Sequence, residues 1–335
     1  MRRRWGICLL ALCLLCGCAG AGQPRTSTFF AMDTVMDVTI YGEEALLSDV
    51  REMIADLEAK VSVTDRSSEL YAINQKGAGK LTGAGGELMR AALALCRRTG
   101  GALDISVYPV VREWGFTTGE YQVPDQATIN GLLAGVDYTR IRCDGETGAV
   151  VLPDGMQVDL GSVAKGYAGS LAAGYLREKG VGSALLNLGG NIQAVGGKPD
   201  GTPWKIAVKD PGGDTPMIVL SVKDQAVVTS GGYERYFQRD GKTYWHIMDP
   251  STGRPAERGL LSVTVVGEDG LACDGLSTAL FVMGLEKAAA FWQQSRDFEA
   301  VFVTDRGELY LTAGLASRFA LTEDHQDAVV YVIER

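Results

Sequence analysis

Apolar residues recur along the chain with two spacings, and each spacing predicts one kind of element. In residues 28–41 apolar and polar positions alternate, which predicts a β-strand. Residues 43–60 carry apolar side chains three and four positions apart, which is typical of an amphipathic helix. Further helices are predicted over 86–99, 163–179, 271–283 and 286–295.

Short apolar runs rich in β-branched residues predict most of the remaining elements. Residues 102–150 keep neither spacing and are predicted to be irregular, with short strand pieces. Helices and strands do not alternate regularly, and many strands are close enough in sequence to form hairpins. An α+β fold with mixed, largely antiparallel sheets and packed helices is therefore predicted instead of a doubly wound sheet. The predicted strands cover 184–188, 204–209, 217–222, 226–229, 233–238, 243–248, 260–267, 299–304, 307–312 and 327–333.

The first residues have the pattern of a secretion signal. Three arginines precede a short apolar run that ends at Leu15, and this run is too short to span a bilayer. The next residues, ending at Cys18, resemble a bacterial lipobox, which implies cleavage before Cys18 and a lipid on its sulfur. Cleavage by an ordinary signal peptidase near residues 19–21 is the alternative.

These features divide the chain into three parts. No repeat or linker separates the body into independent domains. We expect the folded part to lie outside the cytoplasm, anchored to the cell membrane by its lipid. The parts are a signal peptide over 1–17, a tether over 18–28 and one domain over 29–335.

Charge and cysteine content exclude several function classes. The formal net charge is −9, which does not favour nucleic-acid binding. Four of the seven cysteines lie in the leader region, and the remaining three lack CxxC spacing. Neither a disulfide framework nor a thiolate metal site is therefore expected. The three body cysteines are Cys96, Cys143 and Cys273.

A metal site in this chain would have to use oxygen ligands. Only two histidines are present, so a His-rich zinc or iron site is excluded. Asp274 and Thr278 are four residues apart on a predicted helix and project from one face. A carboxylate with a hydroxyl one turn later suits Mg²⁺, which prefers hard oxygen ligands. The alternative is a capping aspartate and a threonine bonded to its own helix.

The stretch "VDLGSVAKGYAG", residues 158–169, is a candidate anion site. A strand end turns at Gly161 and enters a helix, with Lys165 in its first turns. Free backbone N–H groups, the helix dipole and a cation would together attract a phosphate. The spacing matches neither the P-loop nor the GxGxxG pattern. A purely structural strand-to-helix turn remains the alternative.

Eight short blocks, in this order, resemble the ApbE family, the FAD:protein FMN transferases, over nearly the whole mature chain. The family has a T-fold-like α+β structure and binds flavin in a groove between subdomains. The blocks are Met32-Asp33-Thr34; Ser67-Ser68-Glu69-Leu70 with Asn74; "TGGALDISVYPVVREWGF"; "VDLGSVAKGYA"; "NLGGNI"; "TSGGYERYF"; "HIMDPSTGRP"; and "CDGLSTALFVMG".

The resemblance implies an activity and a set of ligand-binding residues. The family uses Mg²⁺ to transfer the FMN half of FAD to a threonine hydroxyl of a partner protein, leaving AMP. Partners are typically extracytoplasmic membrane redox subunits, for example of the Nqr or Rnf type. Magnesium would be held by Asp274, Thr278 and the carbonyl of Ala164. The FAD-lining residues implied are Met32, Ala102, Leu103, Asp104, Gly161, Lys165, Tyr167 and Ile247.

His246 is the best candidate for the general base that accepts the proton of the acceptor hydroxyl. Imidazole suits this task at neutral pH. Asp249 is expected to orient either the loop or the ring. A structural or flavin-packing role for His246 is the alternative, because the resemblance does not fix the base.

Four positions depart from the family's frequent residues. Thr64 replaces an aromatic that can stack on flavin, which leaves FAD hydrolysis to FMN and AMP as an alternative activity. A flavin-binding lipoprotein without catalysis is the third hypothesis. The other departures are Trp245 for a second histidine, Gly232 for an aspartate and Ser162 for a glycine.

Overall fold

The computed structural model describes residues 22–335. The predicted leader, the lipidation site Cys18 and the start of the tether lie outside the described residues. The α-helices are α1 (Ala45–Val61), α2 (Glu69–Lys76), α3 (Ala84–Arg98), α4 (Tyr108–Glu113), α5 (Gln126–Leu133), α6 (Gly161–Glu178), α7 (Gly270–Met283) and α8 (Leu285–Gln294). The first strands are β1 (Arg25–Ala31), β2 (Thr34–Ile40), β3 (Ala78–Lys80), β4 (Arg142–Cys143), β5 (Ala149–Val151), β6 (Ala184–Leu188), β7 (Asn191–Val195), β8 (Trp204–Lys209), β9 (Pro216–Val222) and β10 (Ala226–Gly231). The later strands are β11 (Tyr236–Arg239), β12 (Lys242–Trp245), β13 (Met248–Asp249), β14 (Arg254–Pro255), β15 (Leu260–Gly267), β16 (Phe298–Thr304), β17 (Leu309–Thr312), β18 (Phe319–Leu321) and β19 (Val330–Ile333).

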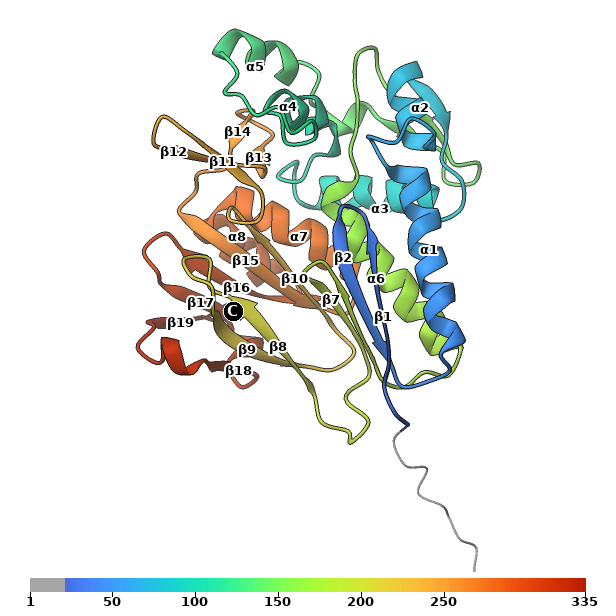
Figure 1. Cartoon of the computed structure of the whole chain (residues 1–335). Coiled ribbons are helices and arrows are strands. Elements are labelled where there is room, and N and C mark those ends of the chain that lie inside the picture. The colour runs from blue at the N-terminus through green and yellow to red at the C-terminus, as the bar shows by residue number, and fades with distance from the viewer. Residues whose placement is uncertain (1–21) are drawn as a thin grey trace, which may run out of the picture.

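A large sheet forms the centre of the molecule. Within residues 22–335 it has nine strands in the order β1-β2-β6-β7-β10-β15-β16-β17-β19. Neighbouring strands are antiparallel, except that β17 and β19 run parallel. Figure 1 shows α1, α6 and α7 packed together along this sheet. The largely antiparallel α+β architecture predicted from the sequence is therefore confirmed.

The central strands bury both of their faces. On β15, Val265 belongs to the main core under the helices. Its neighbour Val266 belongs to a second core, under the small β8-β9-β18 sheet. Because successive side chains of a strand point to opposite faces, nearly every position of this strand is buried. That requirement explains why the strand over 260–267, predicted from the sequence with the same bounds, is mainly apolar, with Ser262 and Thr264 as its polar positions.

The predicted single strand over 28–41 is wrong. The chain reverses at Met32 and Asp33, whose φ angles are 49° and 59°, and β1 and β2 pair as a hairpin. Positive φ is uncommon for residues other than glycine, so no turn signal was visible in the sequence. The Met32 N–H donates to Glu58 Oε1 at 2.9 Å, which fixes the turn to the end of α1. Two residues predicted to lie in a strand thus form a loop.

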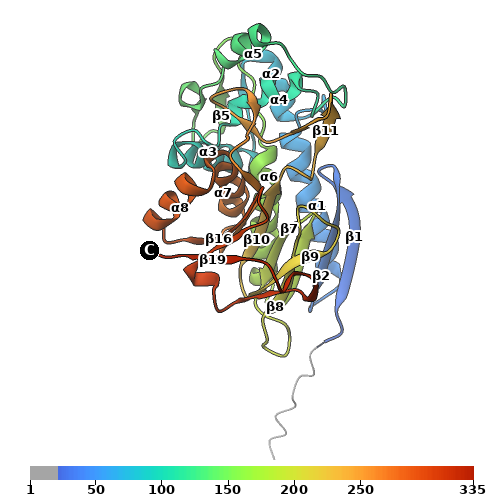
Figure 2. The same ribbon diagram turned by 90° about the vertical axis from the view of Figure 1, so that its left-hand side faces the viewer.

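The region predicted to be irregular, 102–150, holds more structure than expected. It contains the short helices α4 and α5, and α2 was also missed. Together with the β11–β12 hairpin these elements form the upper part of the molecule (Figures 1 and 2). Trp114, which directly follows α4, packs on Tyr244 of β12, with ring centroids 5.3 Å apart. Tyr244 stacks in turn on Phe237 of β11 at 5.2 Å, so aromatic contacts hold the hairpin to the helices.

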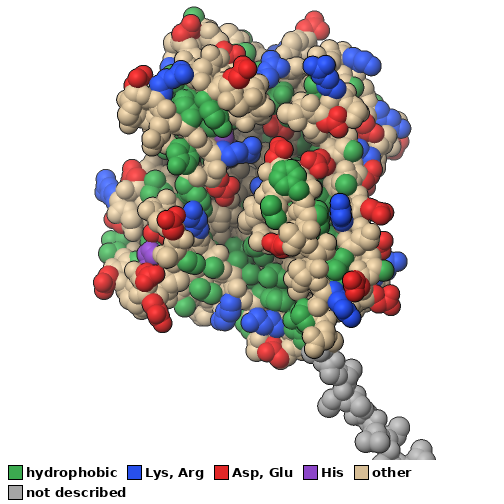
Figure 3. Space-filling view, viewed as in Figure 1, with side chains coloured by type: hydrophobic (Ala, Val, Ile, Leu, Met, Phe, Trp, Pro, Cys, Tyr) green, Lys and Arg blue, Asp and Glu red, His purple; other side chains and the backbone are tan. Residues whose placement is uncertain are grey.

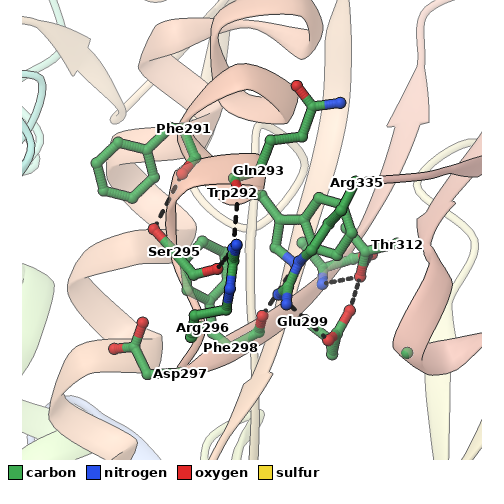
Figure 4. Close-up of polar contacts among 12 residues, drawn as sticks. Phe291, Trp292, Gln293, Ser295, Arg296, Asp297, Phe298, Glu299, Thr312 and Arg335 are labelled. Atoms are coloured by element: carbon green, nitrogen blue, oxygen red, sulfur yellow. Dashed lines mark hydrogen bonds and ion pairs between the residues drawn. The ribbon is translucent and has the colours of Figure 1, made fainter.

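The end of the chain fastens α8 to the sheet. Trp292 of α8 is buried, and its Nε1 donates to the carbonyl of Phe298 on β16 at 3.0 Å. The Arg335 guanidinium lies 4.4 Å from the centre of the Trp292 ring and 3.8 Å from Glu299 (Figure 4). Glu299 also accepts a hydrogen bond from Thr312 of β17.

Among the helices of residues 22–335, none has the length and apolarity that crossing a bilayer requires.

Helices α6 and α7 approach each other closely because glycines face each other. A Cβ atom built on Gly166 would lie 2.1 Å from the carbonyl oxygen of Gly270 and 2.5 Å from the Cβ of Asp274. Both neighbours are fixed, one by the helix backbone and one by burial. Only glycine therefore permits this crossing, and the crossing places α6 backbone beside the α7 carboxylate.

We predict that Gly166→Ala lowers the free energy of unfolding by about 2 kcal/mol or more, because overpacking at a rigid contact forces the helices apart. Gly174→Ala on the same helix is the matched control, since a Cβ there meets nothing within 4 Å. That variant should gain about 0.5 kcal/mol from helix propensity. Urea denaturation followed by circular dichroism measures both. Equal stability of the two variants would contradict the close crossing.

Candidate functional site

A cavity of about 500 Å³ lies between the sheet and the upper helices, within the size range of small-molecule sites. Its walls come from the β1–β2 turn, the end of α1, the segment after α3, the start of α6, the segment around β12 and α7. Figure 3 shows the surface hollowed here, with charged side chains of both signs near the opening. The predicted residues that line it are Met32, Ala102, Leu103, Asp104, Gly161, Ala164, Lys165, His246, Ile247, Asp274 and Thr278.

Asp274 and Thr278 stand one turn apart on α7, as predicted. Asp274 is buried, and its Oδ2 accepts a hydrogen bond from the Gly166 N–H of α6 at 2.8 Å. Burial raises the pKa of Asp274 to about 6, although Lys165 and the Gly166 N–H oppose the shift. Thr278 Oγ1 lies 3.2 Å from the hydroxyl of Ser230 on β10. The site therefore combines the Asp274 carboxylate, whose charge is costly to bury, with the hydroxyl oxygens of Thr278 and Ser230.

The donor set at this place fits a hard cation together with a polar ligand. Carboxylate and hydroxyl oxygens are the ligands that Mg²⁺ accepts. No group of three His, Cys, Asp or Glu side chains in residues 22–335 forms a complete metal site, so a cation would need further oxygens from a ligand. The Asn191 side chain, also in the cavity wall, opposes the rise in the pKa of Asp274 by hydrogen bonding to its carboxylate.

The start of α6 differs from the anion site predicted for it. The Gly161 N–H donates to Asp159 Oδ1 at 2.9 Å, and the Val163 and Ala164 N–H groups donate to the Leu160 carbonyl. These amides are therefore not free to bind a phosphate, contrary to expectation. The sequence did not reveal that Asp159 turns back on its own helix. Lys165, which lines the cavity, supplies a positive side chain at this helix start.

Asp104 lies in the cavity wall with its carboxylate already engaged. Oδ1 accepts hydrogen bonds from the Ser106 N–H and hydroxyl at 2.8 and 2.6 Å, and Oδ2 accepts from the Tyr138 N–H at 3.2 Å. Burial raises its pKa, and these bonds oppose the rise. The side chain thus shapes the loop after α3. Within that loop, Ala102 and Leu103 contribute surface to the cavity.

His246 follows β12 directly and lines the cavity. Its Nδ1 lies 3.2 Å from the carbonyl oxygen of Arg235, which leaves Nε2 for a ligand or a proton. Phe116 packs edge-on against the ring, with centroids 6.3 Å apart. Burial and the nearby Arg235 guanidinium lower the pKa of His246 to about 3. The imidazole is therefore neutral at physiological pH, which is the protonation state that a base requires.

Asp249 orients the loop and not the ring of His246. Its Oδ1 accepts from the Ser251 N–H and hydroxyl, and its Oδ2 accepts from Arg258 Nη2 at 2.8 Å. The Thr252 and Gly253 N–H groups donate to its carbonyl oxygen. Asp249 does not line the cavity. Of the two roles expected for it, the structure supports the organisation of the tight turn.

Tyr167 is the predicted flavin-lining residue that the structure places elsewhere. It does not line the cavity, and its hydroxyl donates to Glu87 Oε2 on α3 at 2.9 Å. It projects from α6 two positions after Lys165, toward a neighbouring helix. Its observed contacts join α6 to α3.

Several cavity residues were not singled out as site residues from the sequence. Glu58 was read as one polar position of an amphipathic helix, and Arg235 as part of a strand. Nothing local distinguished them, because their position depends on tertiary packing. Ser230 was noticed only as a possible capping residue. The residues missed are Glu58, Asp159, Asn191, Ser230 and Arg235, and all of them line the cavity.

Gly232 and Trp245, two of the four positions that the sequence analysis named as departures from the family's frequent residues, contact each other. A Cβ atom built on Gly232 would lie 3.0 Å from the ring of Trp245. The indole fills the space next to this glycine and meets Phe281 of α7 edge-on at 6.2 Å. Thr64 and Ser162, the other departures, line the cavity.

Comparison with protein families identifies residues 32–302 as a match to the ApbE family. The chain belongs to the ApbE family. The FAD:protein FMN transferase of Klebsiella pneumoniae (strain 342) is 36% identical over 285 residues, covering 83% of this chain and 88% of the relative. The enzyme with the same name from Treponema pallidum (strain Nichols) is 31% identical over 361 residues, covering 99% and 98%.

Solved ApbE structures share the fold. The ApbE protein of Thermotoga maritima superposes with a TM-score of 0.80 at 33% identity, covering 86% of this chain and 96% of that one. The flavin transferase ApbE from Vibrio cholerae gives 0.79 at 27% identity, covering 88% and 99%. The predicted ApbE-like α+β fold is therefore confirmed.

The raised pKa of Asp274 predicts that the metal-free ApbE-family protein loses stability as pH rises from about 4 to about 6. The folded state binds this proton more tightly than the unfolded chain, so the cost of ionisation is absent below the unfolded pKa and complete above the folded one. Asp274→Asn keeps an acceptor for the Gly166 N–H. It should be more stable than wild type near pH 8 by up to about 3 kcal/mol.

Urea unfolding in EDTA, near pH 4 and near pH 8, measures this difference. Asp297→Asn is the control, because hydrogen bonding from Arg98 lowers the pKa of that carboxyl. Its carboxylate contributes stability above its unfolded pKa, so this variant should lose stability near pH 8. Parallel pH profiles for wild type and Asp274→Asn would refute the buried-carboxylate interpretation.

Proposed function

We propose that this ApbE-family protein transfers the FMN half of FAD to a threonine hydroxyl of a partner protein and releases AMP. The names of its relatives support flavin transfer from FAD. The observation that carries the proposal for this chain is the Asp274–Thr278 oxygen pair beside Lys165 in one cavity. Breaking the FAD pyrophosphate is transfer at phosphorus, which requires charge neutralisation and in-line positioning.

Magnesium is the cation that we assign to this pair. Asp274, Thr278 and the carbonyl of Ala164 would hold it, and all three residues line the cavity. When bound, Mg²⁺ supplies positive charge to the pyrophosphate oxygens and withdraws charge from the leaving AMP. A divalent cation would also stabilise the charged form of Asp274, which burial disfavours.

The protein's own groups then account for the proton and the charge. His246 Nε2 accepts the proton of the threonine hydroxyl as that oxygen attacks the FMN phosphorus. The bond from this phosphorus to the bridging oxygen breaks, and AMP departs with the electron pair. Lys165 lies on the cavity wall to neutralise phosphate oxygens. The pKa of His246 is low because of burial and Arg235, so a bound pyrophosphate anion would raise it toward the range of an effective base.

One residue favours a second candidate activity. Thr64 lines the cavity, and its hydroxyl and N–H lie 3.3 Å from the Ser62 hydroxyl. An aromatic at this position would cover part of the flavin, whereas threonine leaves room for water. Water attacking the same phosphorus would give free FMN and AMP. A flavin-binding lipoprotein without catalysis would use the same cavity and leave FAD intact.

The partner and the location follow from the same proposal. The acceptor would be an extracytoplasmic domain of a membrane redox protein, for example of the Nqr or Rnf type. A lipid on Cys18 would keep the enzyme at the membrane surface where such acceptors lie. Membrane fractionation of wild type and Cys18→Ala, with palmitate labelling, tests the anchor.

Incubation with FAD, MgCl₂ and a threonine-bearing acceptor domain, followed by intact-protein mass spectrometry, tests the activity. We expect an acceptor carrying FMN on threonine and an equal amount of AMP. Asp274→Asn should abolish Mg²⁺-dependent turnover, whereas Asp297→Asn, on the surface, should retain it. Free FMN without adduct would support hydrolysis, and intact FAD would support simple binding. Full Mg²⁺-dependent activity in Asp274→Asn would refute the metal assignment.

His246→Gln tests the base. Loss of a general base typically costs 10²- to 10⁴-fold, so we expect adduct formation to fall by about 100-fold or more. FAD affinity, measured by flavin fluorescence, should change by less than about threefold, because glutamine keeps a polar group of similar size. The defect should also shrink as pH rises, because a more basic medium ionises the acceptor hydroxyl more readily. Equal losses of binding and transfer would indicate a packing role instead.

A further inference from the structure

The β1–β2 hairpin carries an exposed apolar pair. Phe30 is 70% exposed and Val35 is 55% exposed, and the two residues are direct cross-strand partners. Their sequence neighbours Phe29, Ala31 and Met36 are buried, so Phe30 and Val35 belong to the outward face of the hairpin. We call this pair the hairpin patch. Large apolar side chains exposed together on a soluble protein commonly mark an interaction site.

The hairpin patch borders the mouth of the cavity. Only Ala31, Met32, Asp33 and Thr34 separate the two residues, and the last three line the cavity. The turn is held in place by the hydrogen bond from the Met32 N–H to Glu58. The patch is therefore a rigid continuation of the cavity wall.

The same hairpin offers a free sheet edge. β1 is the first strand of the large sheet and has a partner on one side only. Figure 2 shows β1 at the margin of the sheet, with its length uncovered. An unpaired edge can accept an extended segment of another chain through backbone hydrogen bonds. Such a segment would run directly toward the cavity mouth.

The opposite edge of the sheet shows that exposure alone does not define the site. Tyr331 and Val332 on β19 are 43% and 44% exposed. No residue of β19 lines the cavity, and β19 is the last strand of the sheet, eight positions from β1. Residues 22–24, which lead into β1, lie at the end of that strand remote from Phe30. Of the two edges of the large sheet in residues 22–335, the β1 edge is the one where an exposed apolar pair adjoins the cavity wall.

We propose that the hairpin patch docks the acceptor protein through an extended segment with an apolar side chain next to the threonine that receives FMN. This inference rests on the proposed function, because only a reaction with a polypeptide hydroxyl requires such a segment at the cavity mouth. Burying Phe30 and Val35 under the acceptor supplies affinity, and the edge of β1 sets the direction of the segment. The patch acts on acceptor recognition and leaves the chemistry at the phosphorus to the cavity.

The test is the double variant Phe30→Thr/Val35→Thr, which keeps side chains suited to a strand. We expect the KM for the acceptor domain to rise about tenfold, since each buried apolar side chain contributes substantially to binding. The rate at saturating acceptor and the affinity for FAD should stay within about twofold. Phe30→Leu should retain most of the acceptor affinity. Val151→Thr/Val332→Thr is the matched control, because both residues are exposed on strands away from the cavity.

Direct binding of the acceptor domain to the FAD-loaded protein, by biolayer interferometry, separates this proposal from the proposed function. Wild type that binds the acceptor but forms no adduct would overturn the transferase activity, while loss of binding in the double variant would still support the patch. An unchanged KM and unchanged binding in the double variant would overturn the patch. The same holds if the variant instead loses binding to phosphatidylglycerol vesicles, which would make the patch a membrane contact.

Discussion

The contact between the Gly166 N–H and the Asp274 carboxylate is the constraint on which the site depends. It exists because α6 and α7 cross at glycines, where any side chain would collide with backbone. The crossing removes water from Asp274 and raises its pKa. The same crossing places Lys165, one residue before Gly166, near the carboxylate. The contact between Gly166 and Asp274 therefore determines both how the helices pack and how readily Asp274 ionises. A change that separates the two helices would also change the charge of Asp274.

Two titratable groups of the cavity wall have shifted pKa values that a cation and a pyrophosphate would offset together. Asp274 has a raised pKa because burial disfavours its charged form more than Lys165 stabilises it, and His246 has a lowered pKa because burial and Arg235 oppose its charged form. A nearby cation stabilises the carboxylate form of Asp274, and a nearby anion stabilises the protonated form of His246. Either ligand alone would correct only one of the two. These two pKa shifts are the ones that the proposed binding of a cation together with a pyrophosphate would offset.

The sequence predicted those features that depend on local pattern. β15 and the Asp274–Thr278 pair were found because burial on two faces and helical spacing leave direct signals. The hairpin at Met32 was missed because its positive φ angles depend on a distant hydrogen bond to Glu58. The Gly161 N–H, expected to be free, is bonded because Asp159 turns back to accept its hydrogen bond. Such local hydrogen-bond competition is invisible to spacing arguments.

Trp245 links the two halves of the proposed chemistry. It directly precedes His246, and its indole packs against Phe281, which is three residues after Thr278 on α7. The segment that carries the proposed base, His246, therefore packs against the helix that carries the proposed metal ligands Asp274 and Thr278. Gly232 leaves the room that the indole occupies, since a Cβ there would press against the ring. Gly232 and Trp245, which the sequence analysis singled out separately, thus form one packing contact next to His246, which lines the cavity.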